Sequence, residues 1–341
     1  MIRKRKLLAP VALAAVGITV LAVSAATAST KSTINISIPG ATRSAAPLVV
    51  SVAKPPAGTT FGIVTPLHAD PGQAAMDTAN ARIASLVGAK SVMEDSALDA
   101  SKQLQIADSM LSRGFKPIAT DIIFPHSMDA FLKSAAAKNV PACLEFSTAP
   151  GGAQEDDALA GKEIAAYLHK LFPNGAKGAI LANTPAAVIL NREAGFAAAM
   201  KAYPDLKIVA KQRNLKEVSA EARTMAEGML QAHPEIQFFW TTNDQEALGA
   251  GLAAAGLGKK LVIIGMNGTP EAVDAVKKGI ITATWDSNQN MMGSLVAINC
   301  FNWLATGKAP AAAKSPFTMI DKSNVASWIP WSQRAKLTVI K

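Results

Sequence analysis

The sequence predicts an α/β protein with two lobes, each built on a parallel sheet that helices cover on both faces. Short apolar runs alternate with stretches that carry apolar residues at helical spacing, an order typical of parallel sheets. One alternating series begins at Phe61, and a second of similar size begins at Leu159. The chain of 341 residues is long enough to give each lobe its own core.

The first series predicts four strands separated by three helices. Strands are expected at Phe61–Pro66, Ser91–Glu94, Ile118–Phe124 and Ala142–Phe146. Helices are expected at Gln73–Val87, Ala100–Ser112 and Met128–Lys138. Gly114 is a termination signal after the second of these helices. Four strands so closely spaced indicate one complete parallel sheet.

The second series predicts five helices and five strands. The helices are expected at Leu159–Phe172, Ala186–Ala202, Ala220–Ala232, Gln245–Ala255 and Pro270–Lys278. The strands are expected at Gly178–Asn183, Lys207–Lys211, Gln237–Thr242, Leu261–Met266 and Ile280–Trp285. Thr269 followed by Pro270 is a typical helix start, with an N-cap and then proline in the first turn.

A helix and a mixed tail follow the second series. The helix is expected at Met292–Thr306, and the tail contains candidate strands at Phe317–Ile320 and Leu337–Ile340. Trp328 and Trp331 flank Ile329-Pro330 in this tail. We interpret both indoles as groups that pack against a lobe.

The N-terminus carries the features of a secretory signal peptide, predicted to span residues 1–28. A basic block, Arg3 to Lys6, precedes an uncharged apolar run and then Ala26-Thr27-Ala28, a small-x-small cleavage pattern. The alternative is a membrane anchor, but the apolar run of 17 residues is shorter than the roughly 20 residues of a transmembrane helix. We therefore expect a mature chain beginning near Ser29, exported to the periplasm and not inserted stably in the membrane.

Residues 29–58 are rich in Ser, Thr, Ala and Pro and are predicted to form a tether, with a candidate short strand at Leu48–Val52. The formal net charge of +9 falls to +5 once the four positive residues of the signal peptide are removed. The remaining positive charge is spread along the chain, which argues against a nucleic-acid partner.

No cofactor, metal site or catalytic centre is predicted. The four histidines show no metal-ligand spacing. Cys143 lies in an apolar strand and Cys300 in an apolar helix, so we interpret both as small buried hydrophobic residues, although an exported protein can form disulfides. The sequence lacks the nucleophile elbow, the paired-histidine zinc motif and the phosphate-binding loop that would indicate an enzyme.

Parallel sheets bind ligands beyond the carboxyl ends of their strands, so the segments after each strand are the candidate site. Several of these segments carry ordered motifs. They are Asp99-Ala100-Ser101-Lys102-Gln103, Lys138-Asn139-Val140-Pro141, Asn191-Arg192-Glu193-Ala194-Gly195-Phe196, Thr242-Asn243-Asp244-Gln245, Met266-Asn267-Gly268-Thr269-Pro270 and Met291-Met292-Gly293. Taken in this order over about residues 60–310, they resemble the ribose- and galactose-type periplasmic sugar-binding family, which feeds ABC importers.

The resemblance implies the type I periplasmic binding protein fold: two doubly wound lobes joined by a three-strand hinge. It implies a first lobe of residues 59–155 with 287–313, and a second of residues 156–286 with 314–341. It also implies a monomer that closes on a small, sugar-like molecule and hands it to an ABC transporter permease. No single motif carries this inference; the ordered set does.

The resemblance also implies a set of ligand-binding residues. Arg192 and Asn243 match family positions that bind sugar hydroxyls. Asn267 and Glu145 stand where the family has aspartate, Phe146 where it has arginine, and Ser287 where glutamine is common. The loop from Asp70 to Gln73 lacks the family's stacking aromatics, and Phe146 and Trp285 are the expected replacements. The implied set is Asp70, Gln73, Glu145, Phe146, Arg192, Asn243, Asn267, Trp285 and Ser287.

Three alternatives stay open or are weighed on the sequence. A ligand receptor for a sensor or chemoreceptor would share every feature above. An importer component for a small aromatic molecule or a polyol fits the altered loop equally well. A ligand-binding repressor would need a helix-turn-helix headpiece, and residues 1–58 show a signal peptide and tether pattern instead.

Overall fold

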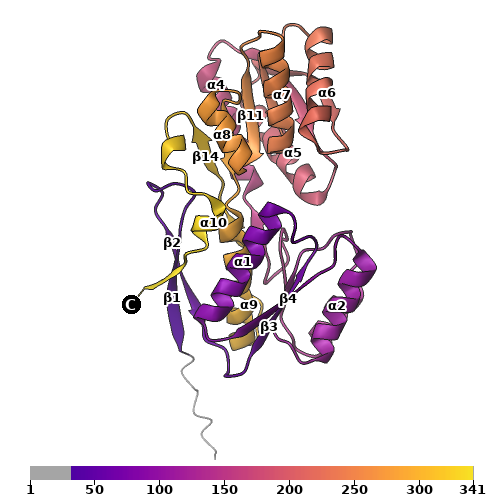
Figure 1. Ribbon diagram of the computed structural model, residues 1–341, viewed down its shortest axis with the longest axis vertical. Coiled ribbons are helices and arrows are strands. Elements are labelled where there is room, and N and C mark those ends of the chain that lie inside the picture. The colour runs from indigo at the N-terminus through magenta and orange to yellow at the C-terminus, as the bar shows by residue number, and fades with distance from the viewer. Residues whose placement is uncertain (1–31, 341) are drawn as a thin grey trace, which may run out of the picture. The chain divides into compact units, whose positions relative to one another are not determined.

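The computed structural model describes residues 32–340, and the predicted signal peptide lies outside the described residues. Two parallel sheets, each covered by helices on both faces, confirm the predicted fold class. Figure 1 shows the helices of the first sheet, α1, α2 and α9, in a group separate from α4 to α8 around the second. Among these residues, no helix combines the length and apolar character needed to cross a membrane.

The first lobe is a four-stranded parallel sheet in the order β4-β3-β5-β6. Its strands are β3 (Thr60–Thr65), β4 (Lys90–Asp95), β5 (Ile118–Thr120) and β6 (Ala142–Leu144). Its helices are α1 (Pro71–Leu86), α2 (Ala100–Ser112), α3 (Asp129–Ala137) and α9 (Gln289–Thr306). Phe61 and Ile63 face α1 and α9, whereas Val64 faces α2 and α3, because successive strand residues point to opposite faces.

The second lobe is a six-stranded sheet in the order β14-β12-β11-β10-β8-β9, parallel except for β14. Its strands are β8 (Ala176–Ala182), β9 (Leu206–Arg213), β10 (Phe238–Thr241), β11 (Val262–Asn267), β12 (Ala283–Asp286) and β14 (Thr318–Asp321). Helices α4 (Asp157–Leu171) and α5 (Ala187–Met200) cover one face. Helices α6 (Ser219–Ala232), α7 (Asp244–Gly256) and α8 (Pro270–Lys278) cover the other.

The chain passes between the lobes along two short parallel strands and one turn. Strand β7 (Ala153–Glu155) leads into the second lobe and pairs with β13 (Ala313–Ser315), which leads back into it later. Residues 287 and 288 connect β12 with α9. The sequence analysis missed β7 and β13 because three-residue strands are too short to show a period.

The described part of segment 29–58 forms strands, which corrects its interpretation as a tether. Strands β1 (Thr33–Ile38) and β2 (Leu48–Ala53) pair with β15 (Thr338–Ile340) in a three-stranded sheet. Ile36, Ile38 and Val52 are fully buried in the apolar cluster of the first lobe. Alternation of Ile34, Ile36 and Ile38 with polar residues is the strand signal, which the Ser/Thr/Pro-rich composition obscured.

The C-terminal tail makes a further passage between the lobes, which the sequence analysis did not foresee. Strand β14 belongs to the second-lobe sheet, whereas Leu337 is buried in the first-lobe cluster and β15 pairs with β1. In Figure 1 the yellow tail runs from β14 through α10 (Trp331–Arg334) to the C-terminal strand beside β1. The last residues of the predicted segment 314–341 therefore pack with the first lobe rather than the second.

The two cysteines form a disulfide, which corrects their interpretation as unpaired hydrophobic residues. Cys143 at the end of β6 is bonded to Cys300 in α9, with Cα atoms 5.8 Å apart. Both residues are fully buried in the first-lobe core. Their 157-residue separation placed them in different predicted elements, so the sequence alone gave no sign that β6 and α9 are neighbours.

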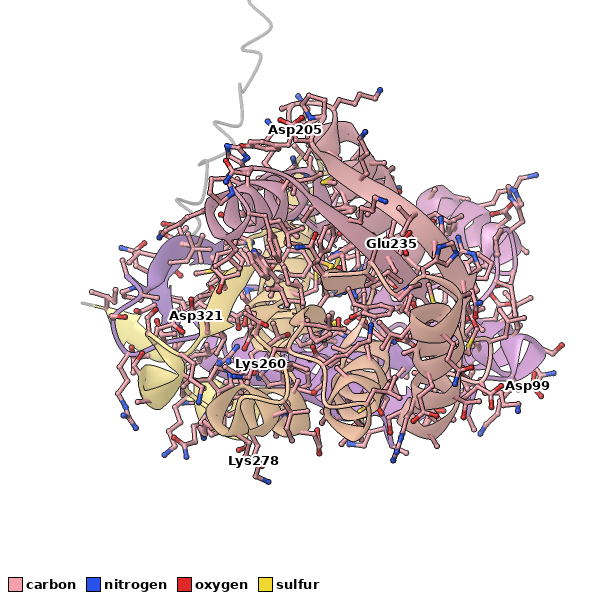
Figure 2. The ribbon with its side chains drawn as sticks, turned by 90° about the horizontal axis from the view of Figure 1, so that it is seen from above. Asp99, Asp205, Glu235, Lys260, Lys278 and Asp321 are labelled. Carbon is pink, nitrogen blue, oxygen red and sulfur yellow. A yellow bond between two sulfur atoms is a disulfide. The ribbon has the colours of Figure 1, made fainter. Side chains whose placement is uncertain are left out.

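The surface carries mixed charge. Figure 2 shows Asp99, Asp205 and Lys278 pointing outwards from different parts of the fold. Lys278 pairs with Asp274 one turn earlier on α8, and Arg113 pairs with Glu94. Such exposed pairs contribute little to stability. They place opposite charges next to one another on the surface.

Candidate ligand-binding site

A pocket of about 600 Å³ lies at the carboxyl ends of strands from both sheets. Its size suits a small ligand. Five of the residues implied by the resemblance line it: Asp70, Phe146, Arg192, Asn243 and Asn267. They come from α1 and β6 of the first lobe and from α5, β10 and β11 of the second. The predicted edge of the two sheets is therefore the place where these side chains meet.

Asn243 is held in place by its role as the N-cap of α7. Its Oδ1 accepts from the backbone N–H groups of Gln245 at 2.9 Å and Glu246 at 3.2 Å. This arrangement fixes the side chain and satisfies two amides of the first helical turn. Within residues 32–340 its Nδ2 group makes no hydrogen bond. Asn243 thus presents a fixed amide donor at the wall of the pocket.

Asn267 stands at the end of β11 in an unusual backbone conformation. Its φ is 116°, and Gly268 follows with a φ of 72°. The backbone oxygen of Asn267 accepts from the N–H of Ser287 at 3.1 Å. A positive φ is uncommon outside glycine and clusters at functional sites. The turn leaves the amide side chain at the pocket with both a donor and an acceptor.

Asp70 and Phe146 form part of the first-lobe wall. Asp70 is the N-cap of α1, and its Oδ1 accepts from the N–H of Gln73 at 2.8 Å. Pro71 follows at the first helical position. Phe146, just after β6, has a φ of 48° and is half-buried against the first-lobe core. This wall therefore offers a carboxylate and an aromatic ring.

Arg192 lines the pocket, but protein partners occupy its guanidinium fork. Its Nε and Nη2 bind the carboxylate of Glu155 at 2.8 to 3.1 Å, and its Nη1 donates to the oxygen of Thr242 at 2.7 Å. Glu155 belongs to β7, and both side chains are almost fully buried. The guanidinium group of Arg192, which the resemblance implies for ligand hydroxyls, instead joins α5 to β7, a strand that connects the lobes.

Gln73 and Glu145 lie in a buried polar network beside the pocket rather than in its lining. Glu145 accepts from Gln73 Nε2 at 2.9 Å and from Asn80 Nδ2 at 2.8 Å. Gln73 also donates to Asp77 at 3.1 Å. Burial, and next the neighbouring carboxylate of Asp77, together raise the pKa of Glu145 to about 8. The network therefore places the carboxyl groups of Glu145 and Asp77 together in a buried site, where a negative charge is unfavourable.

Trp285 and Ser287 are also absent from the lining. Trp285 is fully buried on the α4 face of the sheet, where its Nε1 donates to Glu163 at 3.0 Å. The alternation of β12 turns it away from the pocket. Ser287 is buried and accepts from Gln289 Nε2 at 2.7 Å. Gln289, two residues further on, lines the pocket in its place, and its Oε1 has no partner among residues 32–340.

The sequence analysis missed several lining residues, including Asn183, Glu217, Gln289 and Trp331. Asn183 follows β8 as Asn243 follows β10, so its position at a strand end was the available signal. Its Oδ1 accepts from the hydroxyl of Thr242 at 2.7 Å. Trp331 comes from the tail, and no local pattern placed it there.

Asp244 stabilises the second-lobe wall through hydrogen bonds that it accepts from two neighbouring segments. It accepts from the N–H of Thr269 at 2.8 Å and from the hydroxyl of Thr284 at 2.7 Å, which ties α7 to the start of α8. Burial raises its pKa to about 7, although the hydrogen bonds from Thr284 and Thr269 oppose the shift. Thr269 caps α8 and Pro270 begins it, as predicted.

The pocket carries more negative than positive groups. Among residues 32–340, four acidic residues line it, Asp70, Glu217, Asp244 and Glu271, whereas the one lining cation of this range, Arg192, is neutralised by Glu155. Amide groups and aromatic or aliphatic side chains make up much of the remaining wall. This chemistry suits hydroxyl groups, which both donate and accept, and disfavours anions. Among residues 32–340 no group of three or more acids, histidines or cysteines is placed to hold a metal ion.

Comparison with known proteins gives a consistent family match. Residues 61–308 match a family model described as periplasmic binding protein domain. The ribose import binding protein of Bacillus subtilis is 29% identical over 213 residues, covering 61% of this chain and 69% of that protein. The D-apiose import binding protein of Paraburkholderia graminis is 26% identical over 243 residues, covering 67% and 75% respectively.

The fold has close structural neighbours. A periplasmic ribose ABC transporter structure from Conexibacter woesei superposes with a TM-score of 0.74 at 18% identity, covering 79% of this chain and 94% of that one. At this identity the likeness establishes the fold alone. The match to the family model ends at residue 308, so the tail that carries Trp331 lies beyond it.

Proposed function

This chain belongs to the periplasmic binding protein domain family, and on that premise we propose that it is a solute-binding protein for a neutral sugar or polyol. It captures the ligand in the pocket between its two lobes and delivers it to an ABC importer. The names of the ribose and D-apiose import binding proteins support the transport role and the ligand class. The protein acts by binding and closure, without chemical conversion of the ligand.

The observation that carries the proposal is the set of amides at the strand ends of the second lobe. Asn183, Asn243 and Asn267 end β8, β10 and β11 respectively, and all three line one pocket. Their backbone and capping contacts fix them before a ligand arrives. Preorganised neutral donors and acceptors match the paired hydroxyls of a sugar at low entropic cost.

The proposed ligand is not an anion, because the pocket lining among residues 32–340 offers an anion no unpaired cation. The guanidinium of Arg192 is engaged by Glu155, and the acidic lining would repel a carboxylate or phosphate. The protein thus differs from receptors that bind sugar acids. Export through the predicted signal peptide at residues 1–28 would place this receptor in the periplasm, where an importer meets it.

The lobes move relative to one another about the connecting segments. We assign residues 59–155 with 287–313 to the first lobe and residues 156–286 with 314–336 to the second, and the short paired strands β7 and β13 act in the hinge. Closure of two domains about a few connecting residues is a known mode of motion. A ligand that contacts both walls would favour the closed form.

A thermal-shift screen of the mature protein tests the proposal. The panel is D-ribose, D-apiose, D-allose, D-galactose, xylitol and myo-inositol, chosen to vary ring size and hydroxyl number. A ligand at 100 times its dissociation constant stabilises the folded state by about 2.7 kcal/mol, so at least one member should raise the melting temperature by several degrees. No shift with any neutral sugar or polyol would contradict the proposed function.

A further inference from the structure

The C-terminal tail supplies an aromatic ring to the pocket where the first-lobe loop supplies none. The loop from Asp70 to Gln73 contains no aromatic residue, and Gly72 lies against Gln289, with a Cβ built at Gly72 falling 3.6 Å from the Gln289 Cγ. Trp331 lines the same pocket as Gly72 and Gln289. The first-lobe part of the pocket thus shares its lining with a ring that comes from the C-terminal tail.

The tail segment that carries Trp331 is attached to the end of β12 by hydrogen bonds and an ion pair. Arg334, three residues later, donates its Nη1 and Nη2 to the carboxylate of Asp286, and both side chains are fully buried. Trp328 donates its Nε1 to the same carboxylate at 2.7 Å. Donors on both sides of Trp331 thus converge on one acidic residue, which fixes the position of α10.

The loop between β1 and β2 secures the other side of the tail. The N–H of Ile329 donates to the oxygen of Ala41 at 2.9 Å, and the N–H of Arg43 donates to the oxygen of Ser327 at 2.9 Å. The Arg334 Nε donates to the oxygen of Ile329 at 2.7 Å. These hydrogen bonds fix the backbone on both sides of Trp331. The indole ring of Trp331 therefore keeps a defined position.

Two groups of this part of the pocket lack a partner in the protein. The indole Nε1 of Trp331 and the Oε1 of Gln289 are buried with no hydrogen bond within residues 32–340. Both side chains are 6% exposed. An unpaired buried donor or acceptor costs free energy unless another molecule satisfies it.

We infer that Trp331 is a ligand-contacting residue that determines specificity, a ring brought to the sugar-binding pocket by the C-terminal tail. The inference rests on the proposed function. The indole face packs on the C–H groups of the ligand, since an aromatic face is electron-rich and apolar. Arg334 and Asp286 act as a positioning pair that holds this ring. The tail thereby replaces the aromatic residues that the first-lobe loop lacks.

The test compares the mature wild type with Trp331→Ala, Trp331→Phe and the control Trp303→Phe, which changes a tryptophan of α9 that does not line the pocket. Each protein is titrated calorimetrically with every member of the six-compound panel above that binds the wild type. Trp331→Ala should weaken binding at least about tenfold, since loss of a stacked ring removes both buried area and aromatic contact. Trp331→Phe keeps a ring and should stay within about threefold of the wild type. Trp303→Phe should leave the affinity unchanged.

Ligand-induced change in tryptophan fluorescence gives a second readout that a purely structural role would not move. The wild type should show a spectral change on binding that Trp331→Phe loses and Trp303→Phe keeps. This comparison stands even if Trp331→Ala folds poorly. Equal affinities for wild type and Trp331→Ala, or an unchanged signal in Trp331→Phe, would overturn the inference. Failure of the wild type to bind any of the six compounds would instead refute the proposed function, and the inference would fall with it.

Discussion

The two walls of the pocket differ in what their strand ends offer to a ligand. In the second lobe, Asn183, Asn243 and Asn267 reach the pocket with hydrogen-bonding groups available. In the first lobe, Asp70 and Gln289 reach the pocket, whereas Gln73 and Asn80 turn inward and donate to the carboxyl group of Glu145. We infer from this comparison that the second-lobe amides and the tail carry most of the recognition, whereas the first lobe uses more of its polar groups for its own structure.

Each lobe also depends on a different internal bond. The second lobe is tied to β7 by the buried pair Arg192–Glu155, and the first lobe has the Cys143–Cys300 disulfide. The largest effect is expected from breaking the ion pair. Arg192→Ala leaves the carboxylate of Glu155 buried without its partner and should lower the free energy of unfolding by about 3–5 kcal/mol. Urea denaturation of the unliganded protein measures this loss.

Arg192→Lys serves as the matched control for that variant. Lysine keeps the charge but lacks the planar fork that engages Glu155 at two nitrogens, so it should recover only part of the stability. An unliganded Arg192→Ala protein with wild-type stability but no sugar affinity would contradict this account. That outcome would instead support the ligand-binding role implied by the family resemblance.

Removal of the disulfide should have the next largest effect. Replacing Cys143 and Cys300 together by alanine frees a long loop in the unfolded chain and should cost about 2–4 kcal/mol of stability. Because both cysteines lie in the first-lobe core, ligand affinity at a temperature where the variant is folded should change little. Denaturation of wild type with and without reductant gives an independent measure. A variant as stable as the oxidised wild type would show that the bond contributes nothing.

The pH dependence of stability tests the buried network of the first lobe. The pKa of Glu145 is raised to about 8, so the folded state holds a proton that the unfolded chain releases near its ordinary value of 4.5. Stability from this group is present below pH 4.5 and is lost as the pH rises through about 8. Glu145→Gln cannot ionise, and its stability should decline less by about 2 kcal/mol between pH 6 and pH 8.

Melting curves of wild type and Glu145→Gln across this pH range make the measurement. Asp244 in the second lobe, whose pKa is raised to about 7, contributes a decline of the same sign to both proteins and does not alter their difference. Parallel curves for the two proteins would contradict the assignment of a buried protonated carboxyl to Glu145.

The smallest effect on stability and a clear effect on binding are expected from Asn243→Asp. Aspartate keeps the oxygen that caps α7 but removes the amide donor at the pocket wall. Affinity for a bound sugar should fall about fivefold or more, while the unliganded melting temperature stays near that of wild type. Asn243→Ala, which loses both the cap and the donor, should lower both. Unchanged affinity in Asn243→Asp would remove this residue from the recognition wall.

The sequence predicted those parts of the molecule that local pattern determines. Apolar periodicity located the sheets of both lobes, and the asparagines at strand ends follow from the geometry of parallel sheets. Asn243 and Asn267 were therefore identifiable. The strand at Ile34 to Ile38 was missed because its alternation lies in a Ser/Thr-rich segment where composition suggested a tether.

The remaining features depend on contacts between distant segments. The fork of Arg192 is occupied by Glu155, 37 residues away, so the motif around Arg192 could not reveal its partner. Trp285 and Ser287 were predicted to line the pocket and do not, whereas Gln289 was not predicted and does, because the strand alternation and the turn at residues 287–288 decide which side chain faces the pocket. Trp331 is held at the pocket by the ion pair between Arg334 and Asp286, which lies 48 residues earlier in the chain.

The central claim is that a neutral polyhydroxylated ligand binds a pocket in which Arg192, the only lining cation among residues 32–340, is already paired. The most direct test is calorimetric titration of the mature wild-type protein with matched pairs: D-allose and D-galactose, each beside the uronic acid obtained by oxidising its C6 hydroxymethyl group, which keeps the ring. The account predicts that at least one neutral sugar binds and that its acid binds at least about a hundredfold more weakly, because the acidic lining repels it. Tighter binding of an acid than of its parent sugar would contradict the account.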